Sequence, residues 1–164
     1  MTDFIVKDGY VPGVIGRVVQ LHALYYFKNW GFGSFFEAKV ASEMAAFVTR
    51  YDHTRDGLWA ATVGDEIEGA LVIDGMEAEE KGAHLRWFIV SDKLRGKGAG
   101  KALVDTAMQF CRKKKHPKVY LWTFEGLGAA RHLYEKAGFQ LVEQKSGRQW
   151  GKTVNEQRFE AILS

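Results

Sequence analysis

The sequence predicts an α/β fold, in which a mixed central β-sheet of six to seven strands is flanked by about four helices. The first observation is an apolar strand at 84–90 that runs through a glycine-rich loop directly into an amphipathic helix. The second is a further strand at 118–123, which predicts a parallel crossover because it follows a strand–helix unit. The third is a β-hairpin over 58–73, where two apolar runs flank a Gly/Asp turn.

Composition and charge exclude several classes of protein. The chain of 164 residues is expected to form one domain, 1–164, without repeats or linkers. A net charge of +3 is too small to indicate nucleic acid, and the single Cys111 fits a reducing cytosol. No apolar run approaches the roughly 18–20 residues that cross a bilayer, and the first residues lack the pattern of a signal peptide. We therefore expect a soluble cytoplasmic protein that binds neither nucleic acid nor membrane.

Two helices are predicted near the N-terminus, after a short strand at 4–6. Apolar residues at helical spacing predict the first helix over 14–26. After a glycine break, Ser34 with Glu37 three residues later predicts the N-cap of a second helix, which runs to about Tyr51. Its apolar stripe consists of Phe36, Val40, Met44, Phe47, Val48 and Tyr51.

A dense group of aromatic residues lies between these two helices in the sequence. Its members are Tyr25, Tyr26, Phe27, Trp30, Phe32, Phe35 and Phe36. Such stripes usually pack helix against helix, so a core role is the first interpretation. The second interpretation is that part of the group forms the wall of a ligand pocket.

The remaining elements follow from apolar runs and turn residues. They are an acidic, mobile connection at 77–82, a helix with Ala130, Leu133, Tyr134 and Ala137 on one face and Gly138 as its C′ residue, a strand at 139–144, a loop at 146–151 and a strand at 153–162.

A basic run at 112–115 ends the helix that follows the glycines. It suggests either nucleic-acid binding or a solvated helix end that complements the dipole, and we favour the latter because no aromatic residues are interleaved. Cys111 lies among apolar residues and is interpreted as core.

The glycine-rich loop predicts a site for a phosphorylated ligand, because glycines let the backbone approach an anion at a helix N-terminus. The dinucleotide fingerprint fails, since Lys101 stands where its third glycine belongs. The P-loop pattern fails too, because Gly100-Lys101 is followed by Ala102. What remains is Arg-x-x-Gly-x-Gly, formed by Arg95, Gly98 and Gly100.

This motif resembles that of the GNAT acyl-CoA N-acyltransferases, and a second signature of that family follows it. The second signature is Ala-x-x-Leu-Tyr-x-x-x-Gly-Phe, present as Ala130, Leu133, Tyr134, Gly138 and Phe139. The resemblance implies the GNAT fold over nearly the whole chain and acetyl-CoA as co-substrate, with no metal. The implied cofactor-binding residues are Phe88, Ile89, Val90, Arg95, Gly96, Lys97, Gly98, Ala99, Gly100 and Lys101. The C-terminal half further resembles the acetyltransferase half of bacterial fusions with a MarR-type half, on the residues 85–88, 122–126 and 147–151.

The resemblance also implies roles in catalysis. Tyr134 matches the family's general acid, which protonates the leaving thiolate. His84 and Glu125 are two candidates for the base, and a chain of water molecules is a third. Candidate acceptor-binding residues are Tyr26, Trp30, Arg86 and Trp150. Leu127 stands where many members of the family have an Asn that bonds the pantetheine arm, a contact that Thr123 is a candidate to replace.

We therefore expect an N-acetyltransferase that acts on a primary amine of a small molecule or a protein by direct attack. The alternative is a non-catalytic acyl-CoA-binding module that kept the loop, and a nucleic-acid binder is the third possibility. The family often forms homodimers, so pairing of two chains is a further possibility.

Overall fold

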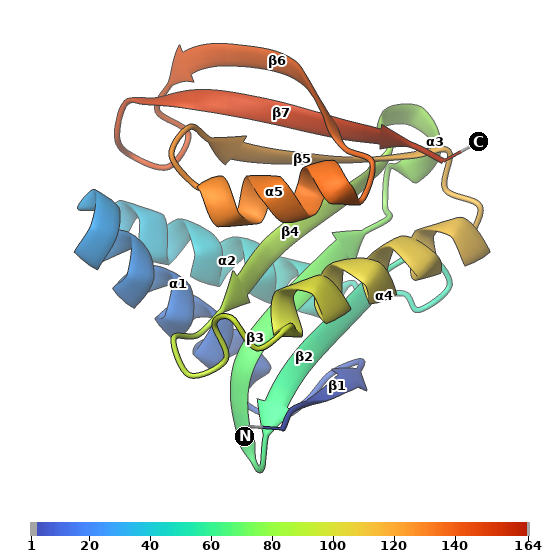
Figure 1. The fold of residues 1–164 in the computed structure, drawn as a ribbon, viewed down its shortest axis with the longest axis horizontal. Helices are drawn as coiled ribbons and strands as arrows, with labels where there is room; N and C mark the ends of the chain where they lie inside the picture. The colour runs from blue at the N-terminus through green and yellow to red at the C-terminus, as the bar shows by residue number, and fades with distance from the viewer. Residues whose placement is uncertain (1–2, 164) are drawn as a thin grey trace.

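The computed structural model describes residues 3–163, which contain one seven-stranded sheet with helices on both faces (Figure 1). The strands are β1 (Ile5–Asp8), β2 (Gly57–Val63), β3 (Glu66–Asp74), β4 (Ala83–Val90), β5 (Lys118–Phe124), β6 (Gln140–Gly147) and β7 (Val154–Ile162). The helices are α1 (Val14–Trp30), α2 (Ser34–Thr49), α3 (Ala78–Lys81), α4 (Ala99–Lys113) and α5 (Gly128–Lys136). The predicted fold class is confirmed.

The order of strands in the sheet is β1-β2-β3-β4-β5-β7-β6. All neighbouring strands are antiparallel except β4 and β5, which are parallel and joined through α4 as the crossover prediction required. β4 and β5 pair at only two positions within the described chain, Ala83 with Val119 and His84 with Tyr120. Beyond His84 the two strands separate, so the sheet has a gap at its centre.

A β-bulge in β4 lies beside this gap. Ala70 of β3 pairs with Ile89 and Val72 pairs with Arg86, so Leu71 alone faces two residues of β4. One of these is Trp87, which has a positive φ of 49° although it is not a glycine. The bulge turns Trp87 toward the core beneath α1 and α2, whereas the next residue, Phe88, packs with the core beneath α4 and α5.

The apolar core has two parts, one on each face of the sheet. α4 and α5 cover the near face in Figure 1, and α1 and α2 cover the other. The buried face of α2 contains Phe36, Val40, Met44 and Phe47 of the predicted stripe. Cys111 is fully buried on the inner face of α4, as predicted, and burial raises the pKa of its thiol to about 12.

Three local predictions were wrong. The carbonyl of Gly33 accepts hydrogen bonds from the N–H groups of Phe36 and Glu37, so Gly33 occupies the cap position and Ser34 lies within the first turn of α2. The segment 77–82, for which an acidic, mobile connection was expected, contains the single-turn helix α3, which is spanned by an ion pair of 2.7 Å between Lys81 and Glu77. β6 continues to Gly147, into the expected loop.

Between residues 3 and 163, no helix has both the length and the apolar character that crossing a membrane requires.

Candidate active site

A cavity of about 890 Å³ opens where β4 and β5 separate. Its walls come from β4, β5, the glycine loop, α1, α2, α5 and the loop before β7. Because β5 no longer pairs with β4 beyond His84, the backbone groups of β4 on that side face the cavity and not a neighbouring strand. The cavity therefore joins the glycine loop at one end to the aromatic cluster of α1 and α2 at the other.

The glycine loop forms one end of the cavity. Gly96 and Gly98 have left-handed backbone conformations, with φ of 78° and 88°, and Gly98 caps α4. A Cβ atom at Gly100 would lie 3.0 Å from Leu133 Cδ1 and 3.3 Å from Phe88 Cζ, so glycine at this position lets these two side chains pack closely against the start of α4. The first N–H groups of α4 have no partner within the helix and give this end a partial positive charge.

Most of the predicted cofactor residues line the cavity. These are Phe88, Ile89, Val90, Arg95, Gly96, Gly98, Gly100 and Lys101. The other two are placed differently: Lys97 is exposed and outside the lining, and Ala99, the first residue of α4, is buried in the core.

Arg95 stands at the rim of this end. Its guanidinium group donates hydrogen bonds to Asp92 Oδ1 (2.5 Å) and to the carbonyl oxygen of Val90 (3.1 Å). It also lies 5.2 Å from the centre of the Tyr25 ring. Half of the side chain is exposed, so the cation is held beside the loop and remains accessible to an anionic ligand.

Tyr134 of α5 lines the cavity. Its ring packs against Phe88, Phe139 and Phe159, and only 6% of the residue is exposed. Burial, and to a lesser extent the neighbouring Tyr26, raises the pKa of its hydroxyl above the usual range. The phenol is therefore fully protonated at neutral pH and available as a donor.

The two predicted base candidates lie in different surroundings. The His84 ring lines the cavity and stacks on Tyr120 with centroids 4.4 Å apart. Burial, helped by the charges of Arg86 and Arg158, lowers its pKa to about 3, so this imidazole is neutral and only weakly basic. Glu125 is exposed, lies outside the lining and is within 3.5 Å of the amide nitrogen of Asn155.

Sequence analysis missed His22, which lines the cavity from α1 and is only 5% exposed. Its Nδ1 lies 2.8 Å from the carbonyl oxygen of Val18, which can only accept, so we assign the proton of the neutral ring to Nδ1. Burial lowers the pKa of His22 to about 4. Its place four residues before Tyr26, on the buried face of the predicted helix, is the sequence signal that could have identified it.

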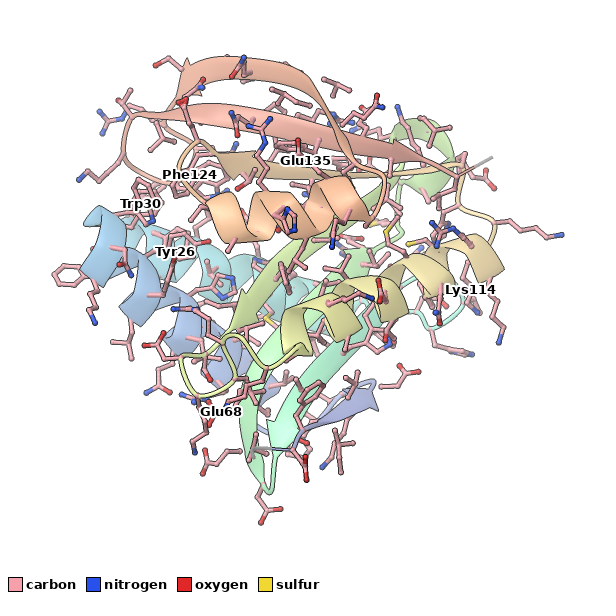
Figure 2. The ribbon with its side chains drawn as sticks, in the orientation of Figure 1. Tyr26, Trp30, Glu68, Lys114, Phe124 and Glu135 are labelled. Carbon is pink, nitrogen blue, oxygen red and sulfur yellow. The ribbon has the colours of Figure 1, made fainter. Side chains whose placement is uncertain are left out.

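The predicted acceptor residues form the far side of the cavity. Tyr26, Arg86 and Trp150 line it, whereas Trp30 packs behind them against Phe124. Tyr26 and Trp30, near the end of α1, both approach Phe124 at the end of β5 (Figure 2). The aromatic group thus serves both roles foreseen for it, as helix packing and as cavity wall.

Residues of α2, of β5 and of the segment before α5 complete the lining. Lys39 and Glu43 of α2, which sequence analysis did not single out, form an ion pair of 2.6 Å beside Arg86. Leu127, in place of the usual Asn, lines the cavity before α5, and Thr123 lines it from β5. Residues 3–163 contain no group of three or more His, Cys, Asp or Glu arranged to hold a metal ion.

Comparison with known proteins identifies several proteins whose sequences are similar to this chain. Human N-acetyltransferase 8B is 24% identical over 155 residues, which are 92% of this chain and 68% of the relative. The N-acetylaspartate synthetase of Danio rerio is 27% identical over 125 residues, or 76% of this chain and 44% of the relative. The rat N-acetyltransferase 8F1 is 32% identical over 107 residues, 63% of this chain and 48% of the relative. The chain thus spans between 44% and 68% of the length of these relatives.

Solved structures share the fold. A protein of Pyrococcus horikoshii has a TM-score of 0.74 at 22% identity, with 99% of both chains covered. The protein yncA of Salmonella typhimurium, solved with its cofactor acetyl-CoA, has a TM-score of 0.78 at 11% identity and covers 99% of this chain and 95% of its own. The sequence profile of the acetyltransferase (GNAT) family matches residues 16–139, which contain both motifs. Since this match extends over most of the sequence, the chain belongs to the GNAT family of acetyl-CoA-dependent acetyltransferases.

Proposed function

We propose that the protein transfers the acetyl group of acetyl-CoA to a primary amine by direct attack of the amine on the thioester. The observation that carries this proposal is the cavity in the gap between β4 and β5, which links the glycine loop at one end to the aromatic residues of α1 and α2 at the other. A long ligand with a diphosphate and a thioester fits such a passage. The acetyl-CoA bound to yncA, which shares the fold, supports this choice of co-substrate.

The glycine loop would hold the diphosphate. The N–H groups between Gly96 and Lys101 supply neutral donors, and Arg95 and Lys101 add positive charge at the rim. Glycine at position 100 lets Leu133 and Phe88 approach the first turn of α4, and all three residues line the cavity beside the loop. The unpaired edge of β4 would then bond the pantetheine amides, and Thr123 offers a hydroxyl on the opposite wall.

The chemistry needs a neutral amine, a stabilised oxyanion and a proton for the thiolate. Backbone N–H groups of β4 around Phe88 to Val90 would stabilise the oxyanion that forms on the attacked carbonyl. Tyr134 would donate its proton to the sulfur as the carbon–sulfur bond breaks. The raised pKa of Tyr134 keeps that proton in place beforehand, and the same apolar surroundings raise the pKa of the thiol that receives it.

We propose that the amine loses its proton to water and not to a strong side-chain base. His22 and His84 face the cavity, but burial lowers their pKa values to about 4 and about 3, which makes both rings poor proton acceptors. Glu125 lies outside the lining, and Glu43 is already paired with Lys39 and Arg86. The neutral histidines serve better as hydrogen-bond acceptors for an amine that arrives uncharged.

We also propose that the protein acts in the cytoplasm, since its single thiol, Cys111, is consistent with a reducing compartment.

The test is release of CoA. Acetyl-CoA binding would be measured by calorimetry, and thiol release would then be followed with a panel of amines, amino acids and peptides. Binding followed by amine-dependent release supports the transferase. Binding without release by any acceptor would favour the non-catalytic acyl-CoA-binding module instead.

A further inference from the structure

An alternating chain of charges borders the acceptor side of the cavity. Lys39 Nζ donates to Glu43 Oε2 at 2.6 Å, and Arg86 Nη2 donates to the other oxygen of Glu43. The second amino group of Arg86 donates to Asp74 Oδ2 at 3.3 Å. Asp74 also accepts two hydrogen bonds from Arg50, of 3.0 and 2.7 Å. The chain therefore begins and ends with a cation and has three positive charges against two negative ones.

The part of this chain that faces the cavity is positive. Lys39, Glu43 and Arg86 line the cavity, and their side chains are 28%, 36% and 18% exposed. Of the lining residues within the described chain, Glu43 alone carries a carboxylate, and both of its oxygens already accept a bond from a cation. Each cation of the chain has a carboxylate partner, but Glu43 is shared between Lys39 and Arg86. Asp74 is likewise shared between Arg86 and Arg50, so the five groups keep a net charge of +1 in partly desolvated surroundings, where an added negative charge is most effective.

The surroundings of this charge are aromatic. The guanidinium group of Arg86 lies 4.1 Å from the centre of the Trp87 ring, which fixes its plane. Tyr26, Phe36 and Trp150 line the same side of the cavity. An acceptor that fits here combines an anionic group for Lys39 and Arg86 with an apolar group for the rings.

We propose that the acceptor is a free amino acid with an apolar or aromatic side chain, whose carboxylate binds at Lys39 and Arg86. This inference rests on the proposed function, because it names the amine that the transferase uses. A polyamine would bring further positive charge to a positive site, and a protein lysine has no carboxylate next to its amine. Both are therefore disfavoured as acceptors.

Matched pairs of acceptors test the proposal. Each pair consists of an amino acid and the amine that lacks only its carboxylate: phenylalanine with phenethylamine, tryptophan with tryptamine, leucine with isoamylamine. Phenylalaninamide and spermidine complete the panel, and kcat/KM for CoA release is measured for each. We expect the amino acid to exceed its decarboxylated partner by about 10- to 100-fold in at least one pair, as a charged hydrogen bond predicts.

A pair of variants assigns the preference to its residue. Lys39→Gln should remove most of the advantage of the amino acid by raising its KM and should leave the KM of the decarboxylated amine nearly unchanged. Lys114→Gln makes the same change of charge at the far end of α4 (Figure 2) and should leave the preference intact.

The possible outcomes distinguish a failure of this inference from a failure of the proposed function on which it rests. If decarboxylated amines or spermidine react as well as the amino acids, the inference is wrong while the transferase stands. The same conclusion follows if Lys39→Gln and Lys114→Gln keep the preference equally. If acetyl-CoA binds and no acceptor of any kind releases CoA, the proposed function fails and the inference fails with it.

Discussion

His84 of β4 and Tyr120 of β5 stack with their ring centroids 4.4 Å apart, at the last pair of residues that joins the two strands. The contact marks the point where the sheet divides. On one side of it, hydrogen bonds hold β4 and β5 together, and on the other side the cavity begins. A ligand bound in the gap would take the place of the missing strand contacts, so its affinity depends on the backbone of β4 as well as on the glycine loop.

Replacing Tyr134 by Phe removes the hydroxyl proposed to protonate the thiolate and leaves the ring packed against Phe88 and Phe139. We expect kcat to fall about 100- to 10,000-fold, the usual contribution of a general acid, while the Kd for acetyl-CoA changes little. Steady-state kinetics and calorimetry check the two quantities. Tyr51→Phe, on the chain after α2 and outside the lining, is the matched control. Normal turnover in the Tyr134 variant would remove this residue as the acid.

Gly98→Ala tests whether the loop binds the co-substrate. Gly98 and Gly64 both have left-handed backbones and open space around an added Cβ, so alanine at either position should cost about 1–2 kcal/mol of stability. Only Gly98 borders the cavity, whereas Gly64 lies in the turn between β2 and β3. We expect about a tenfold or greater loss of acetyl-CoA affinity for Gly98→Ala alone, measured by calorimetry, with urea unfolding as the check on stability. Equal affinities in the two variants would contradict a role for the loop.

Arg95→Ala should weaken the binding of CoA by about tenfold or more, as expected for a hydrogen bond between a cation and a phosphate. Pantetheine, which has no phosphate, should lose little affinity, because Arg95 stands at the rim beside the loop. Lys93→Ala is the control, since Lys93 is two residues away, exposed, and outside the lining. The phosphate contact is refuted if CoA and pantetheine lose the same factor.

The buried His22 should make the free energy of unfolding decrease as the pH is lowered. Its pKa is lowered from the ordinary 6.5 to about 4 in the folded protein, so the unfolded chain binds the extra proton first as the pH decreases. The stability is therefore intact above pH 6.5 and is lost progressively toward pH 4, by about 2 kcal/mol between pH 7.5 and about pH 5. His84 adds a loss of the same sign.

Urea unfolding of His22→Asn at several pH values measures this loss. The Asn amide can still donate to the carbonyl oxygen of Val18 but does not titrate, so the variant should show a flatter dependence on pH. His53→Asn, at an exposed loop position, is the control. Parallel pH dependences for the wild type and His22→Asn would show that His22 is not held neutral.

The sequence was sufficient for the features that depend on local pattern. The glycines at 96, 98 and 100, the crossover from β4 to β5 and the face of α5 that carries Tyr134 all follow from spacing along the chain. The location of Cys111 in the core followed in the same way. These predictions held because each rests on residues within one element or between two consecutive ones.

Features that depend on distant elements were not predictable. Lys39 and Glu43 occupy the polar positions of α2 and read as an ordinary solvated helix face, until the packing of α2 brings them beside Arg86. The sequences of β4 and β5 do not indicate where the two strands separate, because apolar residues continue through both of them. Ser34 shows the limit even of local signals, because the Ser-x-x-Glu pattern fits but the helix begins one residue earlier than the pattern places it.

The left-handed backbone of Trp87 has a consequence for attempts to stabilise this protein. A bulky residue with φ of 49° is unfavourable, by about 1–2 kcal/mol, and glycine would relieve the strain. Yet the same ring stacks beneath Arg86 and meets Phe47 of α2 at 6.0 Å. Selection for heat resistance would therefore favour glycine at position 87, which relieves the backbone strain but removes a ring that lines the cavity. At this position we expect thermal stability and catalytic turnover to change in opposite directions.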